Sequence, residues 1–350
     1  MSSLALPVIS VAGGAISAAT HPVLSGSLLA FLAYGPPHLV ERLLRFDVMG
    51  HTLQGEGTTT VLRVLLGLGL VKTLNRMMNS WATTNWHVAP IRGWQWNQEI
   101  AVVTGGCNGI GKCIVLGLIK KGVRVAILDV MPLPPDLERE SCITYWKCDI
   151  TSAAAVAETA AAIRKTLGHP SILVNNAGIA TPHSIIETPH GYLQKIVGVN
   201  LMALWITTKE FLPNMIIKNK GHIVTIASLA SFTGMPLVAD YGATKAGALS
   251  FHESLVSEIK TVYKSPGILA TVVHPFYVNT NMTAQIGASL ERQTGGLMKP
   301  EAISTPVVKQ IFSRRGGQLI VPGRLSFLAA VRGWPNWVQE VIKDNLPKTE

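Results

Sequence analysis

The sequence predicts an α/β fold in which about seven parallel strands form a doubly wound sheet. Three observations predict it. Short apolar runs alternate with helix-like stretches between residues 100 and 321, a glycine-rich turn follows the first run, and an aspartate ends the second. Parallel strands joined through helices need right-handed crossovers, which cover both faces of the sheet with helices.

The individual elements follow from the apolar runs and the turn residues between them. Strands are predicted near 100–104, 123–128, 143–147, 171–175, 221–227, 268–273 and 317–321. Helices are predicted near 109–121, 152–167, 186–218 and 239–263, and residues 277–305 are predicted to form a long irregular connection. The alternating pattern defines one domain over residues 96–322, with flanks of different character on both sides.

A glycine-rich turn joins the first predicted strand to the first predicted helix. The apolar run from Ile100 to Val103 leads into Thr104-Gly-Gly-Cys-Asn-Gly-Ile-Gly111. Glycines let the backbone approach a pyrophosphate closely, and the helix that follows offers free N–H groups and a favourable dipole. This arrangement predicts a Rossmann dinucleotide site. The loop residues expected to bind the dinucleotide are Thr104, Gly105, Asn108, Gly109, Ile110 and Gly111.

Asp129 ends the second apolar run, eighteen residues beyond Gly111. A carboxylate at this place accepts hydrogen bonds from an adenosine ribose diol and repels a 2′-phosphate. Neither Asn108 nor Val130 offers a cation for that phosphate, so NAD(H) is favoured over NADP(H). The alternative is an ordinary glycine turn beside a solvated aspartate, which the flanking strands make less attractive.

Tyr241 and Lys245 lie four residues apart, and Ser228 lies thirteen residues before Tyr241. On a helix this spacing places a phenol and an ammonium on one face. A nearby cation stabilises phenolate, so we expect Lys245 to lower the pKa of Tyr241 from about 10 towards working pH. Such a tyrosine can act as a catalytic acid or base. Taken alone the pair is weak, because tyrosine and lysine often share a solvated helix face.

Further motifs follow in order along the chain. They are Cys148-Asp149-Ile150, Asn175-Asn176-Ala177-Gly178, Asn200 and Pro275-Phe-Tyr-Val278-Asn-Thr280. Together with the glycine turn and the serine, tyrosine and lysine, they resemble the short-chain dehydrogenase/reductase family over roughly residues 97–322. Within it the chain looks most like the branch of membrane-anchored retinol, long-chain-alcohol and steroid dehydrogenases. Phe276 stands where the family usually has glycine.

The resemblance implies an NAD-dependent oxidoreductase that moves a hydride between nicotinamide and a lipophilic alcohol or ketone. It assigns Tyr241 as the acid or base, Lys245 as the group that lowers its pKa, Ser228 as a hydrogen-bond partner of the substrate oxygen, and Asn200 as the residue that positions a water beside Lys245. The remaining cofactor-binding residues that it implies are Asp149, Ile150, Asn176, Ala177, Gly178, Pro275, Val278 and Thr280. The alternatives are a soluble small-molecule carbonyl reductase and a non-catalytic, cofactor-bound scaffold on lipid surfaces.

Residues 1–95 form an apolar extension ahead of this domain. Residues 1–40 contain no Asp, Glu, Lys or Arg, and another apolar stretch runs from Val61 to Val71. No stretch is an unbroken apolar run of about 20 residues, so a shallow or hairpin membrane anchor is expected rather than a simple spanning helix. The alternative is an arm buried against the domain or a partner subunit. Tryptophans typical of a membrane–water boundary crowd the junction with the domain: Trp81, Trp86, Trp94 and Trp96.

Residues 323–350 have the pattern of an amphipathic segment with Pro335 as a kink. Such a segment lies on a membrane surface or closes a substrate pocket, and the pattern fits both. The connection after the Pro275 motif is short of charge, so its apolar side chains are expected to line a pocket for a lipophilic substrate. These side chains are Phe276, Tyr277, Met282, Ile286, Leu290 and Met298.

The composition limits the partners. The net charge of +10 suits anionic lipid headgroups, and the lack of any basic run of five or more residues argues against nucleic acid. The four cysteines have no metal-ligand spacing and are predicted to be free thiols in a reducing compartment. Basic residues flank the apolar stretches on the domain side, which predicts a cytosolic catalytic domain. The resemblance suggests the endoplasmic reticulum or a lipid droplet, and makes a homodimer possible.

Overall fold

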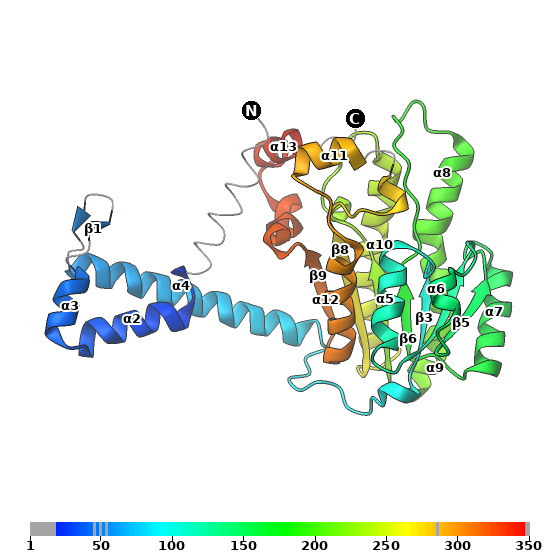
Figure 1. Ribbon diagram of the computed structural model, residues 1–350, viewed down its shortest axis with the longest axis horizontal. Coiled ribbons are helices and arrows are strands. Elements are labelled where there is room, and N and C mark those ends of the chain that lie inside the picture. Colours follow the sequence, from blue (N-terminus) through cyan, green and yellow to red (C-terminus); the bar gives the residue numbers. More distant parts are fainter. Residues whose placement is uncertain (1–18, 45–46, 49–50, 53–54, 285–286, 347–350) are drawn as a thin grey trace. The chain divides into compact units, whose positions relative to one another are not determined.

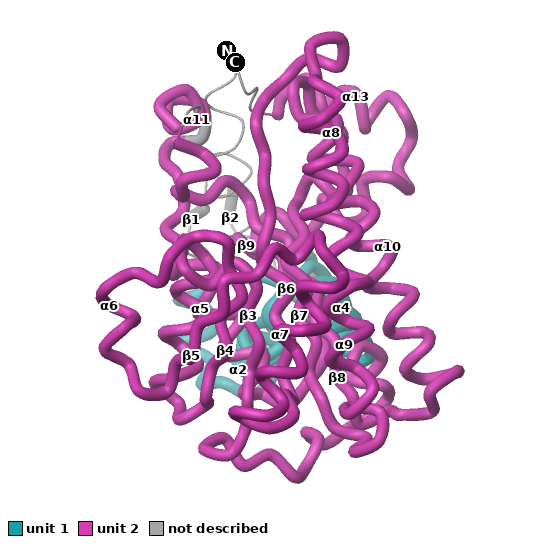
Figure 2. Tube along the Cα trace, turned by 90° about the vertical axis from the view of Figure 1, so that its right-hand side faces the viewer, with its two compact units in different colours: residues 1–80 teal, residues 81–350 magenta. Residues whose placement is uncertain are grey.

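The computed structural model describes residues 19–44, 47–48, 51–52, 55–284 and 287–346. The chain forms two compact units, residues 1–80 and residues 81–350, which Figure 2 shows in two colours. All the strands predicted for the sheet lie in the second unit. The four cysteines lie in this described part of the second unit and are free thiols, as predicted.

Within the described residues, seven parallel strands form the sheet of the second unit, in the order β5-β4-β3-β6-β7-β8-β9 (Figure 1). Their bounds are β3 Ile100–Thr104, β4 Arg124–Asp129, β5 Ile143–Lys147, β6 Ile172–Asn175, β7 Gly221–Ile226, β8 Ile268–Pro275 and β9 Gly317–Val321. The strand order reverses direction between β3 and β6. A crevice at the carboxyl ends of the strands is expected at such a reversal. The predicted doubly wound parallel sheet is confirmed.

Helices cover both faces of this sheet. One face carries α7 Ala153–Thr166, α9 Ala203–Lys218 and α10 Ala239–Thr261, and the other carries α5 Gly109–Ile119 and α12 Pro300–Ser313. Four shorter helices of the described residues complete the second unit: α6 Pro135–Glu138, α8 His190–Val197, α11 Gly287–Thr294 and α13 Asn336–Asp344.

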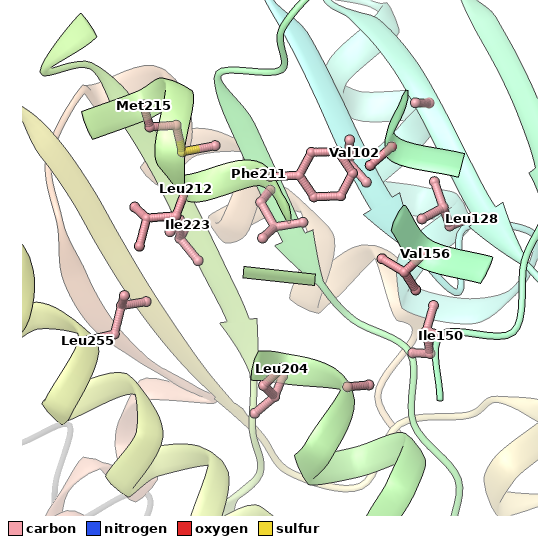
Figure 3. Packing of buried hydrophobic residues seen from close by; sticks show 14 of the residues in the cluster. Val102, Leu128, Ile150, Val156, Leu204, Phe211, Leu212, Met215, Ile223 and Leu255 are labelled. Carbon is pink, nitrogen blue, oxygen red and sulfur yellow. The ribbon is translucent and has the colours of Figure 1, made fainter. Parts of the chain in front are cut away.

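The core lies between each layer of helices and the sheet. Val102 and Ile223 of the sheet are fully buried against Phe211 and Met215 of α9 (Figure 3). The strands point alternate side chains to the opposite face, where a second apolar cluster forms with α5 and α12. The inner strands β3, β6, β7 and β8 are buried along their whole length and are mostly apolar, and this is why they could be predicted closely.

The prediction of a single helix over residues 186–218 is wrong in two places. The helix begins only at His190, after Pro189, and residues Gly198–Met202 form a π-helical turn between α8 and α9. A π-helical turn widens the helix locally and is frequent at functional sites. This one contains Asn200, one of the predicted site residues.

The prediction of an irregular connection over residues 277–305 is also wrong in part, because α11 and the start of α12 lie within it. The second helix was hidden by Pro306 in its interior, since an interior proline normally predicts a break. Ile303, Val307 and Ile311 are fully buried along one face of α12. Their burial contributes roughly 1.5–3 kcal/mol for each side chain, comparable with the proline penalty or larger.

The first unit contains α2 Pro22–Tyr34, α3 Pro37–Leu44, the two short strands β1 Asp47–Val48 and β2 His51–Thr52, and α4 Gly55–Ala82, whose last two residues belong to the second unit. The two longer helices approach each other closely, because Gly69 of α4 contacts the carbonyl of Thr20 ahead of α2. Of the described residues, Gly57–Ala82 alone form a helix long and apolar enough to cross a membrane. The 26 residues would extend about 39 Å. The sequence contains no unbroken apolar run here, because Arg63 and Lys72 interrupt the pattern.

The second unit begins with a segment that is fixed at the amino ends of the strands. Asn85 adopts a left-handed backbone conformation, and its side-chain amide donates to the carbonyls of Pro266 and Ile268 at 2.9 and 3.0 Å. Further along the segment, Arg315 donates to the carbonyl of Val88 at 2.7 Å. The chain therefore enters this unit at the amino ends of the strands, beside the start of β8.

Two of the four junction tryptophans belong to the core of the second unit. The rings of Trp94 and Trp96 stack with centroids 5.1 Å apart, and Trp96 lies against Phe312 of α12 at 4.3 Å. Lys220 lies over the Trp94 ring at 5.0 Å. Packing within the unit thus accounts for these two tryptophans, whereas Trp86 is 60% exposed.

Candidate active site

A cavity of about 730 Å³ opens at the carboxyl ends of the strands. Its walls include the turn after β3, the end of β4, the segments that follow β6, β7 and β8, and one face of α10. Open parallel sheets bind their ligands at this place, because loops from both sides of the strand-order reversal meet there. The predicted site residues therefore belong to one cavity or to its supports.

The glycine loop has the backbone geometry that a pyrophosphate requires. Gly105 and Gly109 have positive φ angles of 64° and 53°. The Asn108 side chain caps α5 by accepting a hydrogen bond from the N–H of Gly109 at 2.7 Å. A Cβ at Gly111 would collide with the carbonyl of Gly105, so this glycine is needed for the turn itself. The loop thus places the start of α5 at the cavity wall, where a helix N-terminus favours an anion.

Thr104 and Asn176 hold the glycine loop against the end of β6. The Thr104 hydroxyl accepts hydrogen bonds from the N–H groups of Asn176 and Ala177 at 3.0 and 3.1 Å. In return, the Asn176 side chain donates to the carbonyls of Thr104 and Gly105, both at 3.0 Å. Thr104 is buried and does not line the cavity, so it supports the loop.

The Asp129 carboxylate is held at the cavity wall by backbone N–H groups. One oxygen accepts from Cys107 at 2.9 Å, and the other accepts from Met131 at 3.0 Å. A carboxylate oxygen can accept two hydrogen bonds, so both oxygens keep capacity for a diol. The basic side chain of Lys112 on α5 forms an ion pair with Asp136 at 2.6 Å, which diverts this neighbouring cation from the site.

Ser228, Tyr241 and Lys245 meet at the opposite wall of the cavity. Ser228 follows β7, and its hydroxyl accepts from the N–H of Ala230 at 3.2 Å. Tyr241 and Lys245 lie one turn apart on α10, and the Lys245 ammonium donates to the carbonyl of Ile226 at 2.8 Å. The turn after β7 and the first part of α10 therefore bring a hydroxyl, a phenol and an ammonium to one place.

Burial controls the protonation of this group. It lowers the pKa of Lys245 to about 8 and raises the pKa of Tyr241, while the hydrogen bond with Ser228 lowers the pKa of Tyr241. The expected lowering of the Tyr241 pKa by Lys245 is therefore not found in this structure. The physical reason is that the phenol is desolvated, whereas the ammonium is directed to the carbonyl of Ile226.

Asn200 lies beneath the cavity and does not line it. Its side-chain oxygen accepts from the N–H of Ile179 at 2.8 Å, and its amide donates to the carbonyl of Ile179 at 2.9 Å and to Thr244 at 3.2 Å. A Cβ added to Gly178 would lie 3.3 Å from the Asn200 oxygen and 3.5 Å from the Lys245 nitrogen. Asn200 and Lys245 therefore face the same glycine, although the asparagine side chain is already used in binding the loop.

The other predicted site residues mostly line the cavity. Those that do are Gly105, Asn108, Gly109, Ile110, Asp129, Asp149, Ile150, Asn176, Ala177, Gly178, Pro275, Val278 and Thr280. Thr104, Gly111 and Asn200 act from behind the wall. The prediction missed several lining residues outside the motifs: Met131, Thr151 and Ile179 on loops, Lys195 on α8 and Val199 in the π-helical turn.

The apolar side chains predicted to line a substrate pocket divide into three groups. Phe276, Tyr277 and Met282 line the cavity. Leu290 is fully buried away from it, and Met298 pairs with Val278 through the backbone instead. Ile286 lies outside the described residues. Two residues of the C-terminal segment, Leu328 and Leu346, complete the apolar wall.

The C-terminal segment forms a 3₁₀ stretch, Gly323–Gly333, followed by α13. Pro335 precedes α13 as its N-cap, where the sequence predicted a kink. Trp337 and Val341 are 72% and 54% exposed on α13, whereas Leu328 is buried. The segment thus borders the cavity on one side and presents apolar side chains to the outside. The last predicted residues, 347–350, lie outside the described part.

His274 is a site residue for which the sequence carried no recognised signal. Its Nδ1 donates to the backbone carbonyl of Ser228 at 2.9 Å, and its Nε2 lies 3.2 Å from the Gln318 amide. Burial lowers the pKa of His274 to about 4, so the imidazole is neutral at physiological pH. It therefore fixes the turn that carries Ser228.

A doubly wound sheet with this glycine loop and an acidic end to β4 is typical of nucleotide-binding Rossmann domains, which include the dinucleotide-dependent oxidoreductases. A family model described as short chain dehydrogenase matches residues 99–291. The chain belongs to the short-chain dehydrogenase family, as its motifs predicted, and is an oxidoreductase of the kind that uses NAD or NADP.

Curated relatives extend this assignment. The chain is 39% identical over 182 residues to "Dehydrogenase RED2" of Cochliobolus heterostrophus, an alignment that covers 51% of this chain and 68% of that protein. It is 42% identical over 215 residues to "Retinol dehydrogenase 10" of Homo sapiens, covering 53% and 63%. It is 36% identical over 193 residues to "Epidermal retinol dehydrogenase 2" of Mus musculus, covering 53% and 62%. The chain thus spans about two thirds of the length of these relatives, and the predicted resemblance to the retinol dehydrogenase branch is confirmed.

A solved structure supports the fold. Ligand-free aldohexose dehydrogenase of Thermoplasma acidophilum matches with a TM-score of 0.57 at 24% identity, covering 65% of this chain and 94% of that one. At this identity the similarity concerns the Rossmann fold alone.

Proposed function

We propose that this chain is an NAD-dependent dehydrogenase or reductase of lipophilic alcohols and ketones, such as retinoids, steroids or long-chain lipids. One observation carries the proposal. Ser228, Tyr241 and Lys245 lie in the same cavity as the glycine loop, and much of the remaining wall is apolar. A ligand-sized cavity with a few convergent polar groups is the expected form of such a site.

Each of the three proposed catalytic residues that line the cavity has a definite task. Tyr241 gives a proton to the substrate oxygen in reduction and takes it back in oxidation. Ser228 donates a hydrogen bond to the same oxygen and limits the charge that develops there. Lys245, charged below a pKa of about 8, lies one turn from Tyr241 and offers donors to ribose hydroxyls. Bound nicotinamide supplies or accepts the hydride.

Asn200 has a positioning task that the resemblance did not imply. Its side chain binds both backbone groups of Ile179 and so fixes the loop that contains Gly178. The π-helical turn brings it to this position. We assign Asn200 as a positioning residue for the loop beneath Lys245. Its position is also compatible with the role that the resemblance implies, which is to hold a water beside the Lys245 ammonium.

The preference for NAD(H) rests on Asp129. Its oxygens are oriented by two backbone N–H groups, so the negative charge stays at the place where a 2′-phosphate would lie. Lys112 is paired with Asp136 and is not positioned to neutralise such a phosphate. A ribose diol therefore suits this wall better than a phosphate.

The first unit of the chain and the retinol dehydrogenase relatives both support membrane association. Most of the Gly57–Ala82 helix is exposed within the structure, with 11% of its most apolar window buried. Retinol, the substrate in the names of two relatives, is a membrane-soluble alcohol. We place the catalytic unit on the cytosolic side of the endoplasmic reticulum or of a lipid droplet.

A homodimer is also part of the proposal. Met202, in the π-helical turn, and Trp205, on α9, are exposed and suit a contact between two copies of the chain.

The decisive experiment follows NADH absorbance with purified protein and a homologous series of alcohols and ketones in detergent or liposomes. Burying one methylene contributes about 0.8 kcal/mol, so kcat/KM should rise about fourfold for each added carbon until the cavity is filled. A preference for short polar substrates would favour the soluble carbonyl reductase. Binding of NADH without turnover of any substrate would favour the scaffold.

A further inference from the structure

Tyr277 carries a hydroxyl that the proposed catalytic group does not use. Tyr277 follows Phe276 in the chain, and its side chain lines the cavity that contains Tyr241. The hydroxyl donates to the thioether sulfur of Met235 at 3.4 Å. A thioether is a weak acceptor and has no proton to donate in return. The hydroxyl can therefore accept a further hydrogen bond and can exchange its weak acceptor for a stronger one.

Packing, more than this weak hydrogen bond, fixes the position of Tyr277. The Phe276 ring meets it edge to face, with centroids 4.8 Å apart. Its backbone carbonyl accepts from the N–H of Met298 at 3.0 Å, and the following residue, Val278, is buried. Burial, and to a smaller extent the nearby Tyr241, raises the pKa of Tyr277 to about 12. The group is thus a fixed, protonated phenol.

We propose that the Tyr277 hydroxyl binds a second oxygen of the substrate, so that the enzyme prefers apolar alcohols and ketones that carry another hydroxyl or keto group near the reacting carbon. This inference rests on the proposed function and narrows its substrate class. A polar substrate group buried without a partner costs free energy, whereas a phenol can donate to it and accept from it. Tyr241 is committed to the reacting oxygen, which leaves Tyr277 for the second one.

The test compares two substrates with NAD⁺: a medium-chain secondary alcohol and the matching diol whose second hydroxyl lies two carbons away. We expect wild-type protein to show the higher kcat/KM for the diol. Tyr277→Phe should lower the ratio of kcat/KM for the diol to kcat/KM for the alcohol about 10-fold, because the free energy of one neutral hydrogen bond corresponds to about that factor. Tyr263→Phe is the matched control, because the Tyr263 hydroxyl binds Glu258 outside the cavity. It should leave the ratio unchanged.

Further measurements separate this inference from its alternatives. If Tyr277 acts only by supporting Met235, Met235→Leu will reproduce the loss of preference, and the inference is overturned. A weaker affinity of Tyr277→Phe for NADH in a fluorescence titration assigns the hydroxyl to the cofactor and also overturns it. A wild-type ratio near one, with good turnover of the plain alcohol, refutes the inference and leaves the proposed function intact. No turnover of either substrate refutes both.

Discussion

The Lys245 ammonium lies 5.6 Å from the centroid of the Tyr241 ring. One turn of α10 sets this separation, and the carbonyl of Ile226 holds the ammonium in place. Burial lowers the pKa of the lysine to about 8 and raises that of the tyrosine, so at neutral pH the pair is an ammonium beside a neutral phenol. The pair is thus ready to donate a proton to a carbonyl oxygen.

Tyr241→Phe should abolish turnover and preserve NADH binding. The substitution removes the proposed proton donor, and general acid–base catalysis contributes roughly 10²–10⁴-fold. Steady-state rates and an NADH fluorescence titration on the same sample measure the two effects. Tyr263→Phe, which removes a half-buried phenol that lies two residues beyond α10 and outside the cavity, should behave as wild type. A Tyr241→Phe enzyme with near wild-type kcat is incompatible with the proposed mechanism.

Asp129→Asn should narrow the preference for NADH over NADPH. The amide keeps the shape and one acceptor oxygen, but it no longer repels a 2′-phosphate and it loses one acceptor for the diol. Charged hydrogen bonds are worth about 1.5–3 kcal/mol, so NADH affinity should fall roughly 10- to 100-fold. Side-by-side titrations of the two cofactors give the ratio. A wild-type protein that binds NADPH more tightly refutes the role of this carboxylate.

The free energy of unfolding should fall on acidification, because three buried histidines are held neutral. Burial lowers the pKa of His222 to about 3 and those of His252 and His274 to about 4. Their unfolded value is 6.5. Their contribution to stability is therefore fully present above pH 6.5 and is lost as pH falls towards 4. For His252 alone the difference amounts to about 3 kcal/mol.

Thermal unfolding between pH 7 and pH 4.5 measures this effect. His252→Gln should flatten the pH dependence of Tm, because it removes one buried imidazole that acid would protonate. Among the described residues, the Nδ1 of His252 has no hydrogen-bond partner that would stabilise the charged ring. The exposed His169→Gln is the control and should reproduce the wild-type slope. A variant slope equal to wild type would show that His252 does not contribute.

The α4 helix should be the principal membrane attachment. Full-length protein should remain in the pellet after alkaline-carbonate extraction, and deletion of residues 1–40 should release it only in part. Leu68→Arg combined with Val71→Arg should release more, since each arginine at the centre of a span costs about 2.5–3.5 kcal/mol. Ile217→Arg, at an 82% exposed position of α9, is the matched control. Recovery of the full-length protein in the supernatant contradicts an integral anchor.

Sequence patterns were sufficient for the parts of the fold that depend on local order. The inner strands are mostly apolar because both of their faces are buried, and the site motifs stand at the strand ends that the fold brings together. Tertiary contacts set the remainder. Nothing near Asn200 shows that its amide will bind Ile179, nor near His274 that its imidazole will hold the Ser228 turn. Leu290 looked available for substrate, but helix formation over α11 buries it.

Asn85 fastens the start of the second unit to the amino end of β8, whereas Pro275 at the other end of the same strand lines the cavity. Eight residues of extended chain separate them, a length of roughly 26 Å. The membrane attachment proposed for α4 and the chemistry proposed for the cavity therefore belong to separate units of the chain. A different targeting sequence joined ahead of Trp81 could redirect the protein to another organelle without rebuilding its catalytic machinery.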